Sequence, residues 1–510
     1  MARPSVPQFS DRAGARVRAH HGARRGLLHR ILRIQRRGPL VALVAVVMLP
    51  VLAGLALYAL PRDDRRICKI AACGVALATL VLVVLTHGQS ATYGWLSRPF
   101  TAAFHFSNGG ISTWIALLLS LCTLCAILTC NVPRLRNFLT LMLLLEGSMM
   151  GLFLARDLLL FALFWDLMLI PVFLGLVGWG EHTATAWRYL IYNFAGGLTL
   201  LLATAAFGIA YGSTDVIGVA GLAHLGNVWQ PWIFAGFAFA FLVKTPVWPL
   251  HTWMPATYAD TPSPMVAVVS AVQSKAGLYG FIVISRALLP ESSHAAANLM
   301  IWLGIVGLLY GAVVALVQTD AKRLVAYSSL SHLGLILIAL FSFNELALRG
   351  AVIYIIAHGL FSSALFLVLG YVEQREETRS LLRLGGLGWQ NPRIAGAFCL
   401  VALAALGLPG LAGFSGELLI LAGVFQSGNI SAALVALVPI VIASAYMLRL
   451  FQGLMNGPQI ADLPIRKDLS WLEGLALAPL IAALVFLGVY PQPVASFDAS
   501  SYAVHAAVKK

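Results

Sequence analysis

Six ionisable residues lie inside long apolar stretches of the sequence, where an unpaired charge is costly. They are Asp166, Lys244, Lys275, His332, His358 and Glu417. Carboxylates, amines and imidazoles bind and release protons, and imidazole does so near neutral pH. Buried ion pairs contribute little to stability. A series of such groups therefore favours a path for protons or ions over a purely structural role.

Asp166 and Lys244 are the first two groups of the series. Asp166 lies about eight residues into its apolar stretch, roughly 12 Å from the helix start, and Lys244 lies at a comparable depth. Two charges about 4 Å apart interact by roughly 4 kcal/mol at an effective dielectric of 20, which is near three pKa units. We predict a pair in which the position of Asp166 sets the proton affinity of Lys244. The alternative is a static ion pair that holds two helices together.

The two histidines lie between Lys275 and Glu417 in the sequence. A lone buried histidine is more often a satisfied core residue than a proton carrier. Two of them between a lysine and a glutamate favour proton transfer, because imidazole titrates near neutral pH and passes protons through water.

Three further residues are candidates for gating access to this path. His251 and Asp260 follow a proline-rich break in an apolar stretch, where ordinary capping and turn chemistry is an equal alternative. Glu146 lies in the middle of an apolar stretch and is either a second carboxylate near the access region or a contact with a neighbouring subunit.

The elements that carry these residues must be membrane helices. The chain has 510 residues, of which 60% are hydrophobic and 11% are charged, with a mean hydropathy of +0.86. A soluble globular domain carries about 25% charged residues. Apolar runs of about 20 residues are long enough to cross the hydrocarbon. We predict an all-α polytopic membrane protein.

The apolar runs predict about fourteen transmembrane helices. Their expected ranges are 39–60, 70–87, 111–131, 137–155, 158–179, 189–211, 232–254, 264–288, 297–317, 326–343, 350–372, 394–426, 430–456 and 473–490. They divide the chain into a basic tail (1–38), three first helices (39–131), two five-helix units (137–288 and 297–456), and a last helix with the C-terminal tail (473–510).

Each five-helix unit contains one interrupted helix. The first break lies at Pro246 and Pro249, beside Lys244, and the second lies at Pro409 and Gly410, just before Glu417. Broken helices at membrane depth are tolerated where protein or a hydrated cavity surrounds them. Paired breaks in two halves of a chain are typical of transport sites built from inverted repeats. We therefore expect two inverted five-helix repeats.

The charge distribution gives two signals about orientation. Most internal Lys and Arg residues fall in loops on one side of the predicted helices, which places those loops in the cytoplasm. The net charge is +14, but residues 1–37 hold ten arginines and one aspartate. This arm indicates contact with anionic lipid or a neighbouring subunit, not nucleic acid. The arm favours the opposite orientation to the one that the loops indicate. An overlong gene start, a surface helix in the arm or a helix count wrong by one would reconcile the two signals.

The chain offers no residue pattern for a metal or a redox cofactor. The six cysteines lie in or beside apolar runs, and Cys122 and Cys125 form a CxxC without a second pair or a histidine at ligand spacing. Small buried side chains are the simpler interpretation. There is also no glycine-rich phosphate loop after a strand. We expect no bound metal, no cofactor and no catalytic residue of redox chemistry in this chain.

The motifs around the buried ionisable residues resemble a known family. They are ARDLLLFALFWDLMLIP, VKTPVWPLHTWMP, VQSKAGLYG, AYSSLSHLGLI, AHGLFSSALFLVLG and GLPGLAGFSGELLIL. Over residues 39–490 the chain is similar to the antiporter-like membrane subunits of proton-pumping NADH:quinone oxidoreductase (respiratory complex I), most of all to the M type. The acidic Glu417 favours the M type, since sister subunits usually carry lysine there.

The resemblance implies a non-redox, proton-translocating subunit with fourteen helices and two inverted repeats. By motif, Lys244 and Lys275 correspond to central lysines, His332 and His358 to relay residues, and Glu417 to the exit-side carboxylate. Asp166 takes the place of a usual glutamate, so its pairing with Lys244 is expected to be weaker or water-mediated. Redox chemistry with NADH and quinone would occur in partner subunits of a bacterial inner-membrane complex.

Two other functions fit the same residues. The chain could belong to a multisubunit cation/proton antiporter, or a related carrier complex, without NADH oxidation. It could also be a structural membrane subunit that has lost pumping, with Asp166 as one symptom.

Overall fold

The protein is a bundle of long helices in a computed structural model that describes residues 39–60, 64–216, 228–457 and 467–496. Twelve helices in these ranges are long and apolar enough to cross a membrane, and three more apolar helices are shorter. The predicted helical, polytopic membrane fold is confirmed. The predicted basic tail (1–38) lies outside the described residues.

The first part of the chain forms seven helices and one hairpin. In order they are the helix Pro39–Ala59, α2 (Arg65–Leu85), β1 (Ser90–Leu96), β2 (Ala102–Ser107), α3 (Ile111–Thr129), α4 (Leu135–Leu154), α5 (Leu158–Leu167), α6 (Leu169–Trp179) and α7 (Thr183–Tyr211). The antiparallel hairpin pairs Ser90 with Ser107 and Tyr93 with Phe104. The all-α prediction missed this hairpin.

The second part contains the first broken helix and an irregular span. It comprises α9 (Gln230–Lys244), α10 (Met254–Asp260), α11 (Ser263–Ala271), a 3₁₀ turn (Gln273–Lys275), α12 (Ala276–Gly280), a π-helical turn (Phe281–Ser285), α13 (Arg286–Leu288) and α14 (Pro290–Ala295). The break at the prolines agrees with the sequence. The irregularity between α11 and α13 was not predicted.

The last part contains the second broken helix. Its elements are α15 (Ala297–Val317), α16 (Ala321–Phe341), α17 (Glu345–Glu376), α18 (Leu387–Gln390), α19 (Pro392–Ala405), α20 (Ala412–Gln426), α21 (Ile430–Met455), α22 (Trp471–Val489) and α23 (Gln492–Ala495). The predicted break at Pro409 and Gly410 falls between α19 and α20. The count of fourteen crossings, the inverted repeats and the division into domains stay predictions.

Two central spans carry most of the functional candidates. The most apolar 18 residues of the spans Ser263–Leu288 and Glu345–Glu376 are all buried inside the protein, whereas only 28% of the corresponding residues of α2 and α22 are buried. Exposed side chains on the outer helices are large and apolar, for example Leu85 and Ile209. A helix apolar on every face is expected inside a bundle or against lipid. Ionisable groups on the central spans are therefore shielded from the bundle surface.

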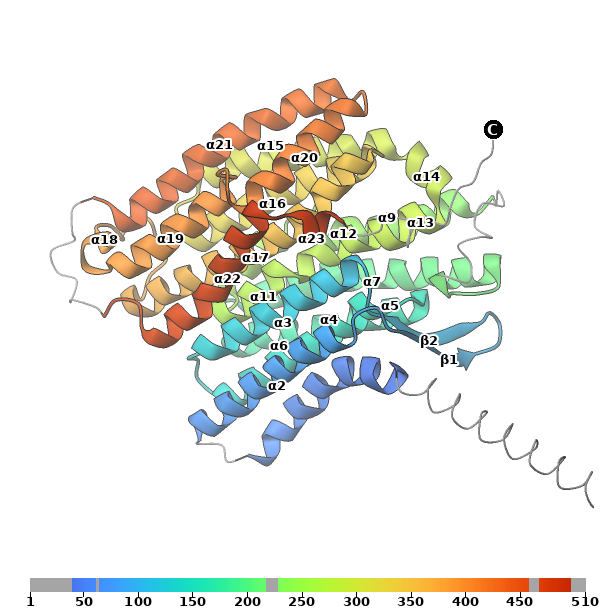
Figure 1. The fold of residues 1–510 in the computed structure, drawn as a ribbon, viewed down its shortest axis with the longest axis horizontal. Coiled ribbons are helices and arrows are strands. Elements are labelled where there is room, and N and C mark those ends of the chain that lie inside the picture. The colour runs from blue at the N-terminus through green and yellow to red at the C-terminus, as the bar shows by residue number, and fades with distance from the viewer. Residues whose placement is uncertain (1–38, 61–63, 217–227, 458–466, 497–510) are drawn as a thin grey trace, which may run out of the picture.

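Basic loops gather at one end of the bundle, which we call the basic end. Arg65 bonds the Val132 carbonyl after α3, and Arg375 bonds the Lys467 carbonyl before α22. Figure 1 shows the β1–β2 hairpin at the opposite end of the bundle from α18. The described Lys and Arg loops therefore share one side, as the sequence predicted, and their assignment to the cytoplasm stays a prediction.

Candidate functional site

Lys244 is the last residue of α9, at the edge of the first break. Pro246 follows and has no N–H to continue the helix. The Trp253 Nε1–H donates to the Val243 carbonyl at 3.0 Å and so ties the start of α10 back to the end of α9. A cation at a helix C-terminus interacts favourably with its free carbonyl groups. The break therefore places the ammonium group at the end of a helix dipole inside the bundle.

The Lys244 ammonium group has no hydrogen-bond partner among the described residues, although the side chain is 1% exposed. Its Nζ lies 4.9 Å from the centre of the Trp165 indole ring. A cation–π contact of this kind stabilises a desolvated cation by only about 2 kcal/mol. The charge at Lys244 is thus incompletely compensated, which suits a group that changes protonation.

Asp166 follows Trp165 on α5 and is half-buried. Its carboxylate packs against Gly197 of α7, where a Cβ atom would collide with Oδ1. No ion pair joins it to Lys244 within the described residues, and its Oδ1 has no hydrogen-bond partner there. The two side chains therefore have neither a hydrogen bond nor an ion pair between them in the described part of the chain. Whether they act as a functional pair stays a prediction.

Lys275 lies in the irregular span between α11 and α12. The 3₁₀ turn that ends at Lys275 interrupts the α-helix, and the π-helical turn follows one helical turn later. Such irregularities inside helices are frequent at functional sites. The Lys275 side chain is fully buried and its Nζ donates to the Ser270 carbonyl of the same span. The irregular backbone thus supplies an acceptor for a buried ammonium group.

His332 on α16 and His358 on α17 form a buried pair. Their ring centres are 5.5 Å apart. Neither ring nitrogen of His358 has a hydrogen-bond partner among the described residues, and its side chain is 0% exposed. The structure therefore pairs His332 with His358, on a helix (α17) that packs against α11 of the span that carries Lys275.

Tyr354 joins this pair to Glu417. Its hydroxyl lies 2.5 Å from His332 Nδ1 and 2.5 Å from Glu417 Oε1. A hydroxyl carries one proton, so it donates to one neighbour and accepts from the other. When His332 carries the Nδ1 proton, the imidazole donates to Tyr354 and Tyr354 donates to Glu417. His332, Tyr354 and Glu417 form a continuous hydrogen-bonded chain.

Close packing of α17 on α20 holds that chain together. Gly416 precedes Glu417, and a Cβ at this glycine would lie 2.7 Å from the Tyr354 Cβ. Only glycine allows the two helices to approach so closely at this point. The second break ends immediately before α20, which leaves Glu417 in the second turn of a new helix. The break thus orients the carboxylate toward Tyr354.

The two parts of the buried series differ in whether their side chains contact one another directly. We call Asp166, Lys244 and Lys275 the lysine region, and His332, Tyr354, His358 and Glu417 the histidine–glutamate region. The first contains buried charges without direct contact between them, and the second contains a bonded chain. The hydrogen bonds of such a chain can relay a proton by successive transfers, whereas the lysine region needs water or side-chain movement to connect its members.

Two of the predicted gating residues lie apart from each other. His251 lies in the turns between α9 and α10 and is 4% exposed. Glu146 is fully buried on α4. Neither touches the series above through a hydrogen bond or ion pair within the described ranges. Their gating roles stay predictions.

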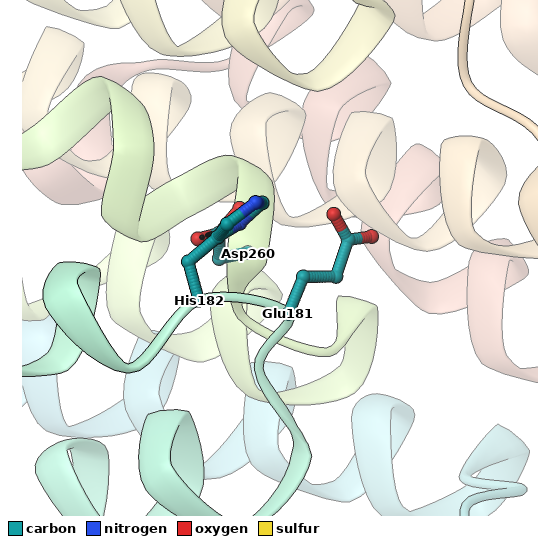
Figure 2. A group of neighbouring side chains, drawn as sticks. All are labelled: Glu181, His182 and Asp260. Atoms are coloured by element: carbon teal, nitrogen blue, oxygen red, sulfur yellow. Dashed lines mark hydrogen bonds and ion pairs between the residues drawn. The ribbon is translucent and has the colours of Figure 1, made fainter.

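The third, Asp260, belongs to a charged cluster at the basic end. It is the last residue of α10, and its Oδ2 accepts from Thr185 at 2.6 Å and lies 3.1 Å from His182 Nδ1. Figure 2 shows His182 and Glu181 from the loop before α7 beside it. The possible ligand atoms of these three side chains lie within 4.8 Å of one another, close enough to hold a metal ion. The prediction of no bound metal stays a prediction.

Arg379 is the cation at the centre of this cluster. It makes two hydrogen bonds to the Glu181 carboxylate, of 2.8 and 2.9 Å, and one of 2.6 Å to Asp320. Its guanidinium also lies 3.7 Å from Asp260. Burial acts to lower the pKa of Arg379, but the charges of Asp320 and Glu181 hold that pKa above its usual range. Arg379 thereby joins residues that are far apart in the sequence.

Sequence reasoning missed Tyr354 and Arg379. Tyr354 lies four residues, one helical turn, before His358, a spacing that places both on one face of α17. That spacing was the available signal. Arg379 is one of the basic loop residues, and nothing in its sequence context indicates Glu181 as a partner almost two hundred residues away.

Comparisons with known proteins identify relatives over most of the chain. Residues 155–443 match the family described as NADH:quinone oxidoreductase/Mrp antiporter, TM. The NADH-quinone oxidoreductase subunit M of Pseudomonas aeruginosa is 35% identical over 80% of this chain and 82% of its own length. A chain of respiratory complex I from Thermus thermophilus has a TM-score of 0.81 at 30% identity, covering 90% of this chain and 98% of its own. A chain of the Mrp complex from Dietzia sp. has a TM-score of 0.81 at 21% identity, covering 90% of this chain and 96% of its own; this likeness shows the fold alone.

Proposed function

The chain belongs to the family of NADH:quinone oxidoreductase/Mrp antiporter membrane subunits, and we propose that it translocates protons as the M-type subunit of a complex I-type enzyme. The relatives are multi-pass membrane subunits of a multisubunit complex, and this chain has the same fold over nine-tenths of its length. Its own role in that enzyme is movement of protons, coupled to redox chemistry in partner subunits.

The proposed path runs through the buried series in one order. Protons are taken up at Lys244, whose affinity depends on the position of Asp166, and pass to Lys275. His358 and His332 receive them next, and Tyr354 hands them to Glu417 for release. Waters bridge the gaps in the lysine region, because charged groups that do not touch exchange protons through water.

The hydrogen-bonded chain from His332 through Tyr354 to Glu417 carries this proposal. Both hydrogen bonds of Tyr354 are buried, and the 2.5 Å distance to Glu417 is typical of a hydroxyl that donates to a carboxylate. A chain that served only to brace the helices would not need a histidine and a carboxylate at its two ends. The neighbouring Lys275 adds a charge that can drive transfer along it.

The first alternative is a cation/proton antiporter subunit without NADH oxidation. The same buried groups would serve that function, and the Mrp likeness supports its fold. Relatives named as subunit M are more similar in sequence, which favours the complex I-type assignment. Genes for NADH- and quinone-binding subunits beside this one would support the proposal, and genes for antiporter subunits alone would support the alternative.

Substitution of Lys244 tests the proposal directly. In the intact complex, Lys244→Met removes the charge and keeps an unbranched side chain. We expect proton pumping, measured in proteoliposomes at matched rates of quinone reduction, to fall by about tenfold or more, because the transfer step loses a group that general acid–base chemistry requires. Lys69→Met, at the basic end of α2, is the matched control and should pump normally.

The Lys244→Met experiment also distinguishes a proton-translocating subunit from a structural subunit that has lost pumping. If Lys244→Met pumps as well as the wild-type complex, the chain does not carry protons through this lysine and acts as a scaffold. Assembly of each variant, followed by native gel electrophoresis, shows whether a loss of pumping reflects a missing subunit.

A further inference from the structure

A basic pocket opens at the basic end of the bundle, outside the buried series. It lies between α7, α10, α15 and α16 and has a volume of about 300 Å³. Among its lining side chains are Arg188, His251, Thr252, Tyr310, Arg323 and Tyr327. No acidic side chain lines it. The pocket therefore concentrates hydrogen-bond donors and positive charge.

The two arginines of the pocket are unpaired. No carboxylate lies within ion-pair distance of Arg188 or Arg323 in the part of the chain that the structure describes. Nearby cations at the same end are neutralised: Lys322 lies 2.6 Å from Glu373, and Arg379 pairs with Glu181 and Asp320. An arginine fork matches the geometry of a phosphate group. Arg188 and Arg323 are exposed, so a ligand can reach them, and no carboxylate of the pocket lining neutralises them.

His251 adds a buried polar atom to the same pocket. Its side chain is more than nine-tenths buried, and its Nδ1 has no hydrogen-bond partner among the residues described. The ring packs against Tyr310, with ring centres 5.0 Å apart, and more loosely against Tyr327. A buried polar atom without a partner is unfavourable unless a ligand or water satisfies it. A ligand that reached Nδ1 from the pocket would satisfy it.

The surroundings of the pocket favour a lipid over a free anion. Ile191 and Leu198 follow Arg188 on the same side of α7 at helical spacing, farther from the basic end. Their side chains are 64% and 45% exposed. A ligand held at Arg188 therefore has an apolar surface beside it toward the centre of the membrane. Basic pockets between membrane helices bind the head groups of anionic lipids.

We propose that this pocket binds the phosphate of an anionic phospholipid, with its acyl chains along α7. The guanidinium groups of Arg188 and Arg323 hold the phosphate oxygens, and His251 donates a further hydrogen bond when its proton is on Nδ1. The turn that carries His251 joins α9 to α10, so the lipid would steady the connection that follows Lys244.

Lipid analysis of the intact complex tests the proposal independently of pumping. The double variant Arg188→Gln/Arg323→Gln is purified in mild detergent, and its tightly bound phospholipids are counted by mass spectrometry. We expect it to lose about one phosphatidylglycerol or cardiolipin per complex relative to the wild type. Arg383→Gln removes an exposed arginine at the same end outside the pocket and should retain the full number. Equal lipid content in all three overturns the proposal.

Two further measurements decide between sources of the anion and guard against misfolding. Delipidated wild-type complex is titrated with inorganic phosphate and, separately, with phosphatidylglycerol or phosphatidylcholine in nanodiscs. If the complex retains phosphatidylglycerol but neither phosphatidylcholine nor inorganic phosphate, the lipid proposal is supported. If it binds inorganic phosphate and retains no lipid, the proposal is overturned. If the double variant does not assemble, an electron-microscopy map of the wild-type complex decides: lipid phosphate in the pocket supports the proposal, and a neighbouring subunit's carboxylate there overturns it.

Discussion

The lysine region and the histidine–glutamate region differ in how their buried ionisable groups contact one another. Lys244 and Asp166 are ionisable groups without a hydrogen bond between them, and the Lys275 ammonium group donates to the backbone carbonyl of Ser270. His332, Tyr354 and Glu417 are linked by two hydrogen bonds of 2.5 Å. One region contains separate ionisable groups, and the other contains a hydrogen-bonded chain.

This difference suggests where control of proton movement resides. A connected chain passes a proton whenever its ends differ in affinity, so it gives little opportunity for gating. A gap between charged groups can be opened or closed by water or by a small movement of a side chain. We infer that the lysine region sets the timing and that the histidine–glutamate region carries the proton onward.

Breaking the connected chain should have the largest effect. Tyr354→Phe keeps the ring between α16 and α20 and removes the hydroxyl that bridges His332 and Glu417. We expect pumping at matched quinone reduction to fall by about tenfold or more, as for loss of a positioned acid–base group.

Tyr446→Phe is the matched control for that loss. The Tyr446 hydroxyl lies 3.5 Å from the other nitrogen of His332 and does not reach Glu417 through a bond that the structure describes. We expect a change of less than about twofold. Equal losses of proton pumping in the two variants would show that both tyrosines only pack around His332. In that case the hydrogen-bonded chain would not be a route for protons.

Arg379→Gln tests whether the two regions depend on the charged cluster that joins their helices. Removing the guanidinium leaves Glu181, Asp260 and Asp320 without their common cation. We expect the free energy of unfolding to fall by about 3 kcal/mol, read as a lower melting temperature of the subunit within the purified complex. Lys69→Met, far from this cluster, should not change the melting temperature.

The pH dependence of this loss has a definite sign. The pKa of Arg379 is raised in the folded protein, so its contribution is complete below the unfolded pKa and disappears only as the pH rises through the folded one. The penalty of Arg379→Gln should therefore be constant between about pH 6 and pH 9. A penalty that vanished toward pH 9 would show that the cluster is not held by a permanent cation.

Gly416→Ala should loosen the histidine–glutamate region alone. The added Cβ would lie 2.7 Å from the Tyr354 Cβ and so push α20 away from α17. We expect a loss of about 1–3 kcal/mol in stability, as for other overpacked cores, together with slower pumping. Gly396→Ala on α19, where the new Cβ meets no atom within 4 Å, is the control and should leave both measurements unchanged.

The sequence was informative wherever a single stretch carried the signal. Apolar length predicted the helices, and Pro246 and Pro409 predicted the two breaks. The sequence also named the lysines, histidines and carboxylates of the buried series, but not Tyr354. These features are local, because a proline or a charge in an apolar run has the same consequence whatever lies beside it.

The features that could not be predicted depend on packing between distant segments. Tyr354 reaches Glu417 only because α17 and α20 meet at Gly416, and Arg379 meets Glu181 only because the loop before α7 lies beside the end of α17. The β1–β2 hairpin was hidden by its short strands between two strong helix signals. The separation of Asp166 from Lys244 is likewise a matter of side-chain direction, which helix position alone does not give.

The smallest effect should come from lengthening the carboxylate in the lysine region. Asp166→Glu adds one methylene, which would bring the carboxylate closer to the Lys244 ammonium group across a space that no hydrogen bond now spans. We expect pumping per quinone reduced to rise by up to about twofold, because a charge interaction strengthens as the distance shortens. Asp166→Asn keeps the size and removes the charge, so it should lower pumping instead. If neither substitution changes the pumping ratio, Asp166 does not tune Lys244, and control in the lysine region must come from the irregular span around Lys275.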